Sequence, residues 1–280
     1  MSVVDFAAHV FNSLFVNFSS TGNGGAITYQ NNGIEIFCSR FSNCQAKNYG
    51  GAIYLSYSNN SISNTAFESC FVQTHSNKQF GNCLYGPNCA TRFEMNTMHK
   101  CGPDHQHSGD SACALSNYVA IVKNLNATEN FGIEGAGSIS LMRPSDGTSV
   151  SYIQCVDIQD GNFLEWYYTS NKISNSNFIN KTHDNYLFYI YSTTITIIDS
   201  CFVNTSPTLL LGGGKIILNN CQSNVSYSGY AINPLMYLNS FQFSICNNKN
   251  VRCNSHQNKL NYSNIILHIL FFVLAQTWSE

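Results

Sequence analysis

Residues 15–53, FVNFSSTGNGGAITYQNNGIEIFCSRFSNCQAKNYGGAI, decide the fold because they contain two copies of one pattern. Gly24-Gly25-Ala26-Ile27 returns as Gly50-Gly51-Ala52-Ile53, 26 residues later. A second element, Phe-x-Asn, moves with it from Phe15-Val16-Asn17 to Phe41-Ser42-Asn43, again over 26 residues. Two elements that keep one spacing indicate an internal repeat, and a period of 20–50 residues is typical of solenoids and related arrays.

The Phe-x-Asn element continues along most of the chain. Clear copies occur at Phe178-Ile179-Asn180 and Phe202-Val203-Asn204, and weaker copies fill the interval between them and the first two. Cys44, Cys70 and Cys101 each lie three residues after the start of a copy, which indicates that equivalent positions stack on one another. The copies begin at nine anchors with a mean step of about 26 residues: Phe15, Phe41, Phe67, Met98, Leu125, Cys155, Phe178, Phe202 and Cys221.

Each unit contains short apolar runs separated by clusters of Asn, Gly and Ser. Runs such as Ile34-Glu35-Ile36-Phe37 have the length and the β-branched or aromatic content of strands. The glycine pair suits a tight turn, because glycine tolerates positive φ. We therefore predict an all-β, right-handed parallel β-helix of about nine coils, with the hand taken from the general preference of parallel crossovers. Its parts would be a cap or first coil at 1–18, the repeats at 19–254, and a cap or short hydrophobic tail at 255–280.

The composition agrees with a β fold and excludes several others. Charged residues make up 10% of the chain, and Asn, Ser and Thr about 31%, so the residues that favour helices are scarce. This argues against helical bundles, coiled coils and Rossmann-type folds. The net charge of −2 provides no basic field for nucleic acid, so we expect no nucleic-acid partner. A hydrophobic content of 44% is enough for a core and argues against disorder.

Twelve cysteines allow two interpretations. The chain is either an extracellular protein with some disulfide bonds or a protein in which buried free thiols act as small apolar residues. Spacing alone does not determine the pairing.

Two groups of residues have side chains suited to chemistry. The first is rich in histidine, but the spacing of its residues matches no known metal-binding motif, so we expect a polar surface loop without metal or cofactor. This group contains His99, Cys101, Asp104, His105, His107, Asp110 and Cys113. The second group could place carboxylates on adjacent coils, as hydrolases built on β-helices do, although solvated turn residues are the simpler interpretation. This group contains Asp157, Asp160, Glu165, His183 and Asp184. We expect no catalytic residue, and a carbohydrate-active enzyme is the alternative.

Seven Asn-x-Ser/Thr sequons would accept glycans if the chain is exported, although so Asn-rich a sequence contains about seven by chance. Asparagines can also stack in hydrogen-bonded ladders along a β-stack. The candidate glycosylation sites are Asn17, Asn59, Asn126, Asn180, Asn204, Asn224 and Asn261.

The ends and the irregular spacings give further expectations. The segment Ile265–Ala275 is apolar except for His268 and is shorter than the roughly 20 residues that span a bilayer, so it either caps the rod or attaches it to a membrane. No basic region precedes the first apolar residues, so a secretory signal is not evident. Extra residues at Thr74–Asn82, Gly102–Ser111 and Met142–Thr148 are predicted to be loops that project from the rod.

The paired Gly-Gly-Ala-Ile and Phe-x-Asn elements resemble those of the polymorphic membrane protein family of surface β-helices. The likeness covers roughly residues 11–254, and it is especially strong to the Asn- and Cys-rich β-helix surface proteins of parasitic protists. The resemblance implies surface exposure, adhesion or antigenic variation, without catalysis. We therefore expect a non-enzymatic, surface or membrane-associated module that binds a protein or glycan on a cell surface. A third hypothesis is a fragment or decayed family copy without function.

Overall fold

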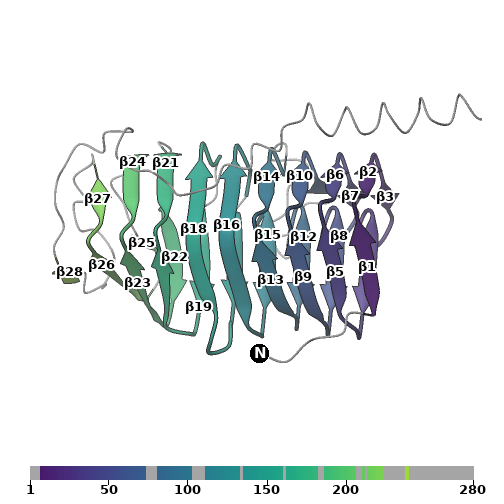
Figure 1. Cartoon of the computed structure of the whole chain (residues 1–280). Coiled ribbons are helices and arrows are strands. Elements are labelled where there is room, and N and C mark those ends of the chain that lie inside the picture. The colour runs from purple at the N-terminus through teal and green to yellow at the C-terminus, as the bar shows by residue number, and fades with distance from the viewer. Residues whose placement is uncertain are drawn as a thin grey trace, which may run out of the picture.

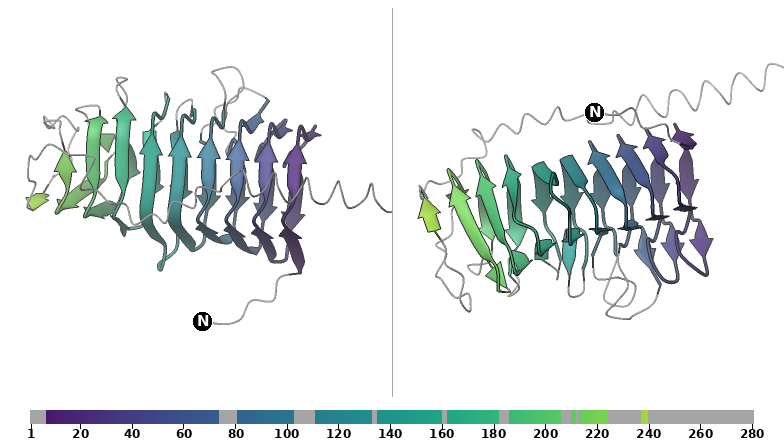
Figure 2. Two further views of the ribbon diagram at one scale, coloured as in Figure 1. Left: turned by 45° about the horizontal axis from the view of Figure 1, so that its top comes forward. Right: turned by 90° about the horizontal axis from the view of Figure 1, so that it is seen from below.

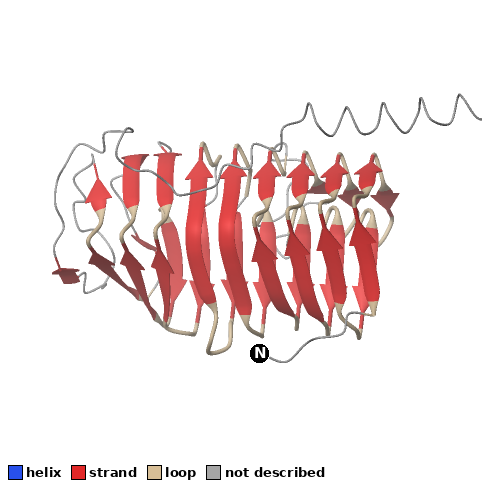
Figure 3. Cartoon of the chain, viewed as in Figure 1, coloured by secondary structure: helices blue, strands red, loops and turns tan. Residues whose placement is uncertain are grey.

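The computed structural model describes residues 7–73, 81–102, 111–132, 135–159, 162–181, 186–205, 210–211, 213–223 and 237–239. These residues form 28 β-strands and contain no helix, and the strands pair in parallel, coil on coil. The coils stack along one axis into a rod (Figures 1 and 2). Figure 3 shows strands and connecting loops, and no helix, among the described residues. The prediction of an all-β parallel β-helix is confirmed.

Each coil passes through three faces of the rod, which we number in chain order. Face 1 contains β1 (Ala8–Phe11), β5 (Ile34–Phe37), β9 (Asn59–Ser63), β13 (Ala90–Glu94), β16 (Ala120–Thr128), β18 (Ser149–Val156), β20 (Asn171–Ser174), β23 (Thr194–Ile198), β26 (Lys215–Asn219) and β28 (Tyr237–Asn239). Face 2 contains β2 (Leu14–Val16), β6 (Arg40–Ser42), β10 (Ala66–Glu68), β14 (Thr97–His99), the second halves of β16 and β18, β21 (Asn177–Lys181), β24 (Cys201–Thr205) and β27 (Gln222–Ser223). Because β16 and β18 run through both faces, these strands form one sheet of 17.

Face 3 closes each coil and gives the number of turns. It contains β4 (Ile27–Gln30), β8 (Ile53–Ser56), β12 (Leu84–Pro87), β15 (Cys113–Ser116), β17 (Ala136–Met142), β19 (Asn162–Tyr167), β22 (Phe188–Tyr191) and β25 (Leu210–Leu211). In the early coils a short sheet of β3 (Ser19–Ser20), β7 (Gln45–Ala46) and β11 (Phe71–Val72) lies between faces 2 and 3. The eight face 3 strands of the described chain delimit seven full turns, slightly fewer than the nine coils predicted, with β1–β3 before them and β26–β28 beyond.

The Phe-x-Asn anchors form a column inside face 2. Phe15 pairs in register with Phe41, and Phe41 with Phe67. Their ring centroids are 4.7 and 5.3 Å apart, the ring planes are nearly parallel, and Phe41 is fully buried. Phe178 and Phe202 repeat the arrangement at 5.2 Å. These separations equal the spacing between hydrogen-bonded strands, so each ring fills the space directly above the one below.

Two of the nine anchors are wrong by two residues. The residue in register with Met98 is Ala127 rather than Leu125, and the residue in register with Phe202 is Ser223 rather than Cys221. Side chains alternate between the two sides of a strand, so a slip of two residues preserves the inward direction. Leu125 and Cys221 are accordingly buried, both at 1% exposure.

The asparagine of each Phe-x-Asn element is a corner residue. Asn17, Asn43, Asn180 and Asn204 have φ angles of 59°, 51°, 54° and 50°. Asparagine enters this left-handed region more readily than most residues, which explains its place at the end of a face 2 strand. The same backbone angle occurs in the weaker copies, where the corner residues are Ser69, Lys100, Glu129 and Asp157.

The two glycines of the Gly-Gly-Ala-Ile element have different roles. Gly24 and Gly50, the first of each pair, have φ angles of 58° and 61°. Gly25 and Gly51, the second, lie against the next coil: a Cβ on Gly51 would be 2.1 Å from the carbonyl oxygen of Asn82. The first glycine therefore makes the turn, and the second permits the close approach of main chains.

The structure describes the N-terminal segment of the chain and one of the three predicted loops. Ala8–Phe11 and Leu14–Val16, within the predicted cap or first coil, form strands paired with β5 and β6. The predicted loop at Met142–Thr148 is a turn between β17 and β18. The other two predicted loops and Ile265–Ala275 fall largely or wholly outside the described residues, among which no helix could cross a bilayer.

We expect Gly51→Ala to lower the free energy of unfolding by about 3 kcal/mol, because the added methyl group collides with main-chain atoms that belong to the coil stack. Gly213→Ala is the matched control, since a Cβ at Gly213 meets no atom within 4 Å. Urea unfolding followed by circular dichroism measures both. Equal stability of the two variants would contradict the role given to Gly51.

Candidate functional site

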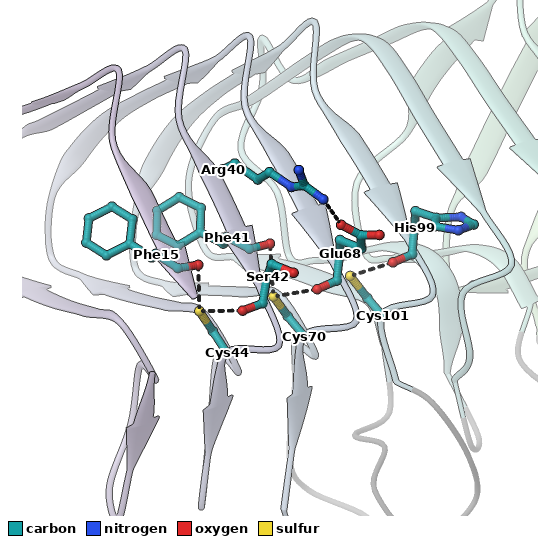
Figure 4. Close-up of polar contacts among 9 residues, drawn as sticks. All are labelled: Phe15, Arg40, Phe41, Ser42, Cys44, Glu68, Cys70, His99 and Cys101. Atoms are coloured by element: carbon teal, nitrogen blue, oxygen red, sulfur yellow. Dashed lines mark hydrogen bonds and ion pairs between the residues drawn. The ribbon is translucent and has the colours of Figure 1, made fainter. Parts of the chain in front are cut away.

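A column of cysteines lies inside the corner after face 2. Cys44, Cys70 and Cys101 are fully buried, one per coil (Figure 4). The Cys70 sulfur lies 3.5 Å from the carbonyl oxygens of Phe41 and of Glu68, and its single S–H donates to one of them at a time. The thiols thus complete the hydrogen bonding of main-chain carbonyls at the corner while their sulfur atoms fill the core.

These thiols are poor candidates for catalysis. Burial raises the pKa of Cys70 and of Cys101 well above the ordinary value, and it raises the pKa of Cys155 to about 12. A thiol must lose its proton to act as a nucleophile or to bind a metal, and these do not at physiological pH. Within the described ranges nine cysteines are free thiols, eight of them buried, as the hypothesis of small apolar residues predicts; Cys201 is disulfide-bonded.

In the native protein at pH 8, we expect iodoacetamide to label exposed Cys38 at least about a hundredfold faster than Cys70 or Cys101, which need local opening. Peptide mapping by mass spectrometry measures the rates, and labelling in urea provides the fully reactive reference. Cys38→Ser should remove the fast phase. Equal rates at Cys38 and Cys70 would show that the column is open to solvent.

The predicted His-rich group gives no metal site in the described part of the chain, where three or more metal-binding side chains nowhere converge. The Nδ1 atom of His99 lies 3.0 Å from the Thr128 hydroxyl, and Cys113 is buried on face 3. The remaining members, Asp104, His105, His107 and Asp110, lie outside the described residues.

Two of the five candidates for carbohydrate chemistry are described, and they occupy different elements. Asp157 is an exposed corner residue after β18. Glu165 is in the middle of β19, 5% exposed, and accepts a hydrogen bond of 2.8 Å from the Ser140 hydroxyl. Asp160, His183 and Asp184 lie outside the described residues.

The described sequon asparagines are all on the surface. Asn17, Asn59, Asn126, Asn180 and Asn204 are exposed, whereas Asn224 and Asn261 lie outside the described residues. The Asn204 amide donates to the Asn180 side-chain oxygen at 3.2 Å, one coil away. At this corner two sequon asparagines are thus hydrogen-bonded to each other from one coil to the next.

Exposed tyrosines gather where the strands of face 3 end. Tyr57, Tyr118, Tyr168 and Tyr191 are 66%, 51%, 51% and 41% exposed. Each is at or just after the last residue of β8, β15, β19 or β22. Because the coils are stacked in register, these positions lie along one edge of the rod, between face 3 and face 1. We call these four residues, with Arg143, the tyrosine edge.

Its densest part spans three coils. The rings of Tyr168 and Tyr191 are 5.5 Å apart, edge to face. Two tyrosines adjoin them on face 3, Tyr167 and Tyr189, and the centres of their rings are 5.4 Å apart. The Arg143 guanidinium is 5.3 Å from the centre of the Tyr168 ring. Each of these contacts places one ring against another or against the cation, so the side chains form one contiguous aromatic surface.

Neutral hydrogen-bonding groups continue the same edge toward the early coils. Asn88 and Asn117 directly follow β12 and β15 with φ angles of 55° and 68°, and the Asn117 amide donates to the Asn88 side-chain oxygen at 2.8 Å. Next to the edge on face 3, burial, followed by the charge of Glu165, raises the pKa of Tyr189, so this phenol keeps its proton. The edge therefore presents aromatic rings, amides and hydroxyls, with Arg143 as a cation.

Sequence reasoning missed the tyrosine edge. Its members have no common local motif, since Tyr57, Arg143 and Tyr168 share only a corner position and a positive φ. The available signal was the position of tyrosine relative to the face 3 strands, which requires the register of every coil.

No protein-family model, curated protein or solved structure matches the chain.

Proposed function

We propose that this chain is a non-enzymatic, surface-displayed β-helix that adheres to a glycan or glycoprotein on another cell. The observation that carries the proposal is the tyrosine edge. Tyrosine supplies large contact area with little loss of side-chain freedom, and together with arginine it is enriched where proteins bind their partners. The solenoid repeats that edge along its length, which suits an extended ligand.

A neutral glycan fits the chemistry of the edge better than a charged ligand. Sugar rings have apolar C–H faces and hydroxyl rims, and the edge provides both kinds of matching group in two neighbouring stretches: the rings of Tyr168 and Tyr191, and the amides of Asn88 and Asn117. Amides both donate and accept hydrogen bonds, as sugar hydroxyls do. The scarcity of charge, 10% of the chain, further favours a neutral partner.

The double variant Tyr168→Ala/Tyr191→Ala should weaken binding to immobilised glycans or to target cells about tenfold, because each lost aromatic contact contributes about 0.5–1.5 kcal/mol. Binding of fluorescent protein measures the change. Tyr152→Ala is the matched control, because Tyr152 is 43% exposed but lies within β18, at the corner between faces 1 and 2. Equal losses in both variants would exclude the tyrosine edge as the binding surface.

Surface display has its own test. Antibody labelling of intact cells should detect the full-length chain, and enzymatic removal of N-glycans should lower its mass, because the described sequon asparagines are exposed. Glycan-site mapping should identify Asn59 or Asn126 among the occupied positions. Full-length protein found only inside the cell would contradict the surface hypothesis, and absence of the full-length chain would favour a decayed copy.

A further inference from the structure

We infer that the first coil docks end to end with the first coil of a second copy of this chain. The coil comprises β1–β4, and in the described structure each of these strands pairs on one side only, with β5–β8. Edge strands offer a row of main-chain donors and acceptors, which another strand can satisfy.

Apolar side chains accompany this edge. Phe11, Leu14, Val16 and Phe18 are 48%, 57%, 42% and 47% exposed. They are four of the six large hydrophobic residues other than tyrosine that are exposed in the described part of the rod. A cluster of this kind at one end of a molecule marks a surface that is buried in an assembly.

The first coil also lacks the features that protect free edges. From residue 7 to residue 33 the sequence contains no Asp, Glu, Lys, Arg or Pro. The second coil, by contrast, contains Glu35, Arg40 and Lys47. Charged residues and prolines are the usual means of preventing edge-to-edge association, so their absence over a whole coil leaves association unopposed.

A second copy satisfies this edge by symmetry. A two-fold axis across the rod at Phe15 would place β2 antiparallel to its counterpart, with Leu14 facing the partner copy's Val16 position. Faces 1 and 3 would exchange, so that β1 and β4, both of four residues, pair across the interface. The half-buried Phe15, stacked at 4.7 Å on Phe41, would continue the phenylalanine column into the second molecule. The two first coils contain no Asp, Glu, Lys or Arg, so they meet without charge repulsion. Because the same surface is used on both copies, the contact produces a dimer and no larger assembly.

Light scattering coupled to size-exclusion chromatography of the full chain tests the proposal. We expect a dimer, and we expect Leu14→Lys/Val16→Lys to raise the dimer dissociation constant at least tenfold, because it places ammonium groups opposite one another. Met95→Lys, at an exposed apolar residue in the middle of the rod, should leave the dimer intact. A monomer at all concentrations would overturn the proposal.

Cross-linking tests the register. In a Cys38→Ser background, mixing Leu14→Cys protein with Val16→Cys protein should give an intermolecular disulfide at higher yield than either protein alone, whereas Met95→Cys should give none. A dimer that forms without this cross-link would overturn the proposed pairing. Unchanged thermal melting of each variant excludes unfolding as the cause. Glycan binding by the monomeric variant reports on the tyrosine edge separately, so either proposal can fail alone.

Discussion

The structure depends on one constraint: every coil must be hydrogen-bonded, strand for strand, to the coil before it. Parallel pairing fixes the spacing of the coils and aligns equivalent residues along the rod. Like side chains therefore meet like side chains, as the stacked Phe15, Phe41 and Phe67 do at 4.7 and 5.3 Å. Aromatic rings, thiols and amides gain from such stacking. Charges of one sign placed one coil apart repel each other, which accounts for a chain with only 10% charged residues.

The same constraint explains which features the sequence revealed. Phe-x-Asn was recognisable because its phenylalanine fills the core and its asparagine makes a corner, and both requirements recur in every coil. Gly-Gly-Ala-Ile was recognisable because a side chain at Gly51 would collide with main-chain atoms, so the position requires glycine. The slip at Leu125 and Cys221 has a physical cause as well, since a shift of two residues changes the register without changing which side chains are inside.

The candidate binding surface was hidden for the opposite reason. Surface positions at the end of face 3 are occupied by residues as different as Asn88, Arg143 and Tyr168, all with positive φ. No local pattern results, and the tyrosines become neighbours only when the coils are stacked. Residues that form a binding surface on a solenoid are thus distributed at intervals of about one coil. Their spacing in the sequence reflects the repeat of the fold and does not identify the ligand.

The direction of the hydrogen bonds between coils has a mechanical consequence for the rod. The bonds between coils lie along the rod axis, so a pull on its two ends loads the few bonds of one coil at a time. Under such a load the rod would peel by single coils. Each coil released, about 26 residues, would add roughly 85 Å of extended chain. Cys44, Cys70 and Cys101 are free thiols, so no disulfide bond among them hinders the release of their coils, whereas the disulfide bond of Cys201 would limit release near that residue. Under load, the early part of such a rod would lengthen in steps before it breaks.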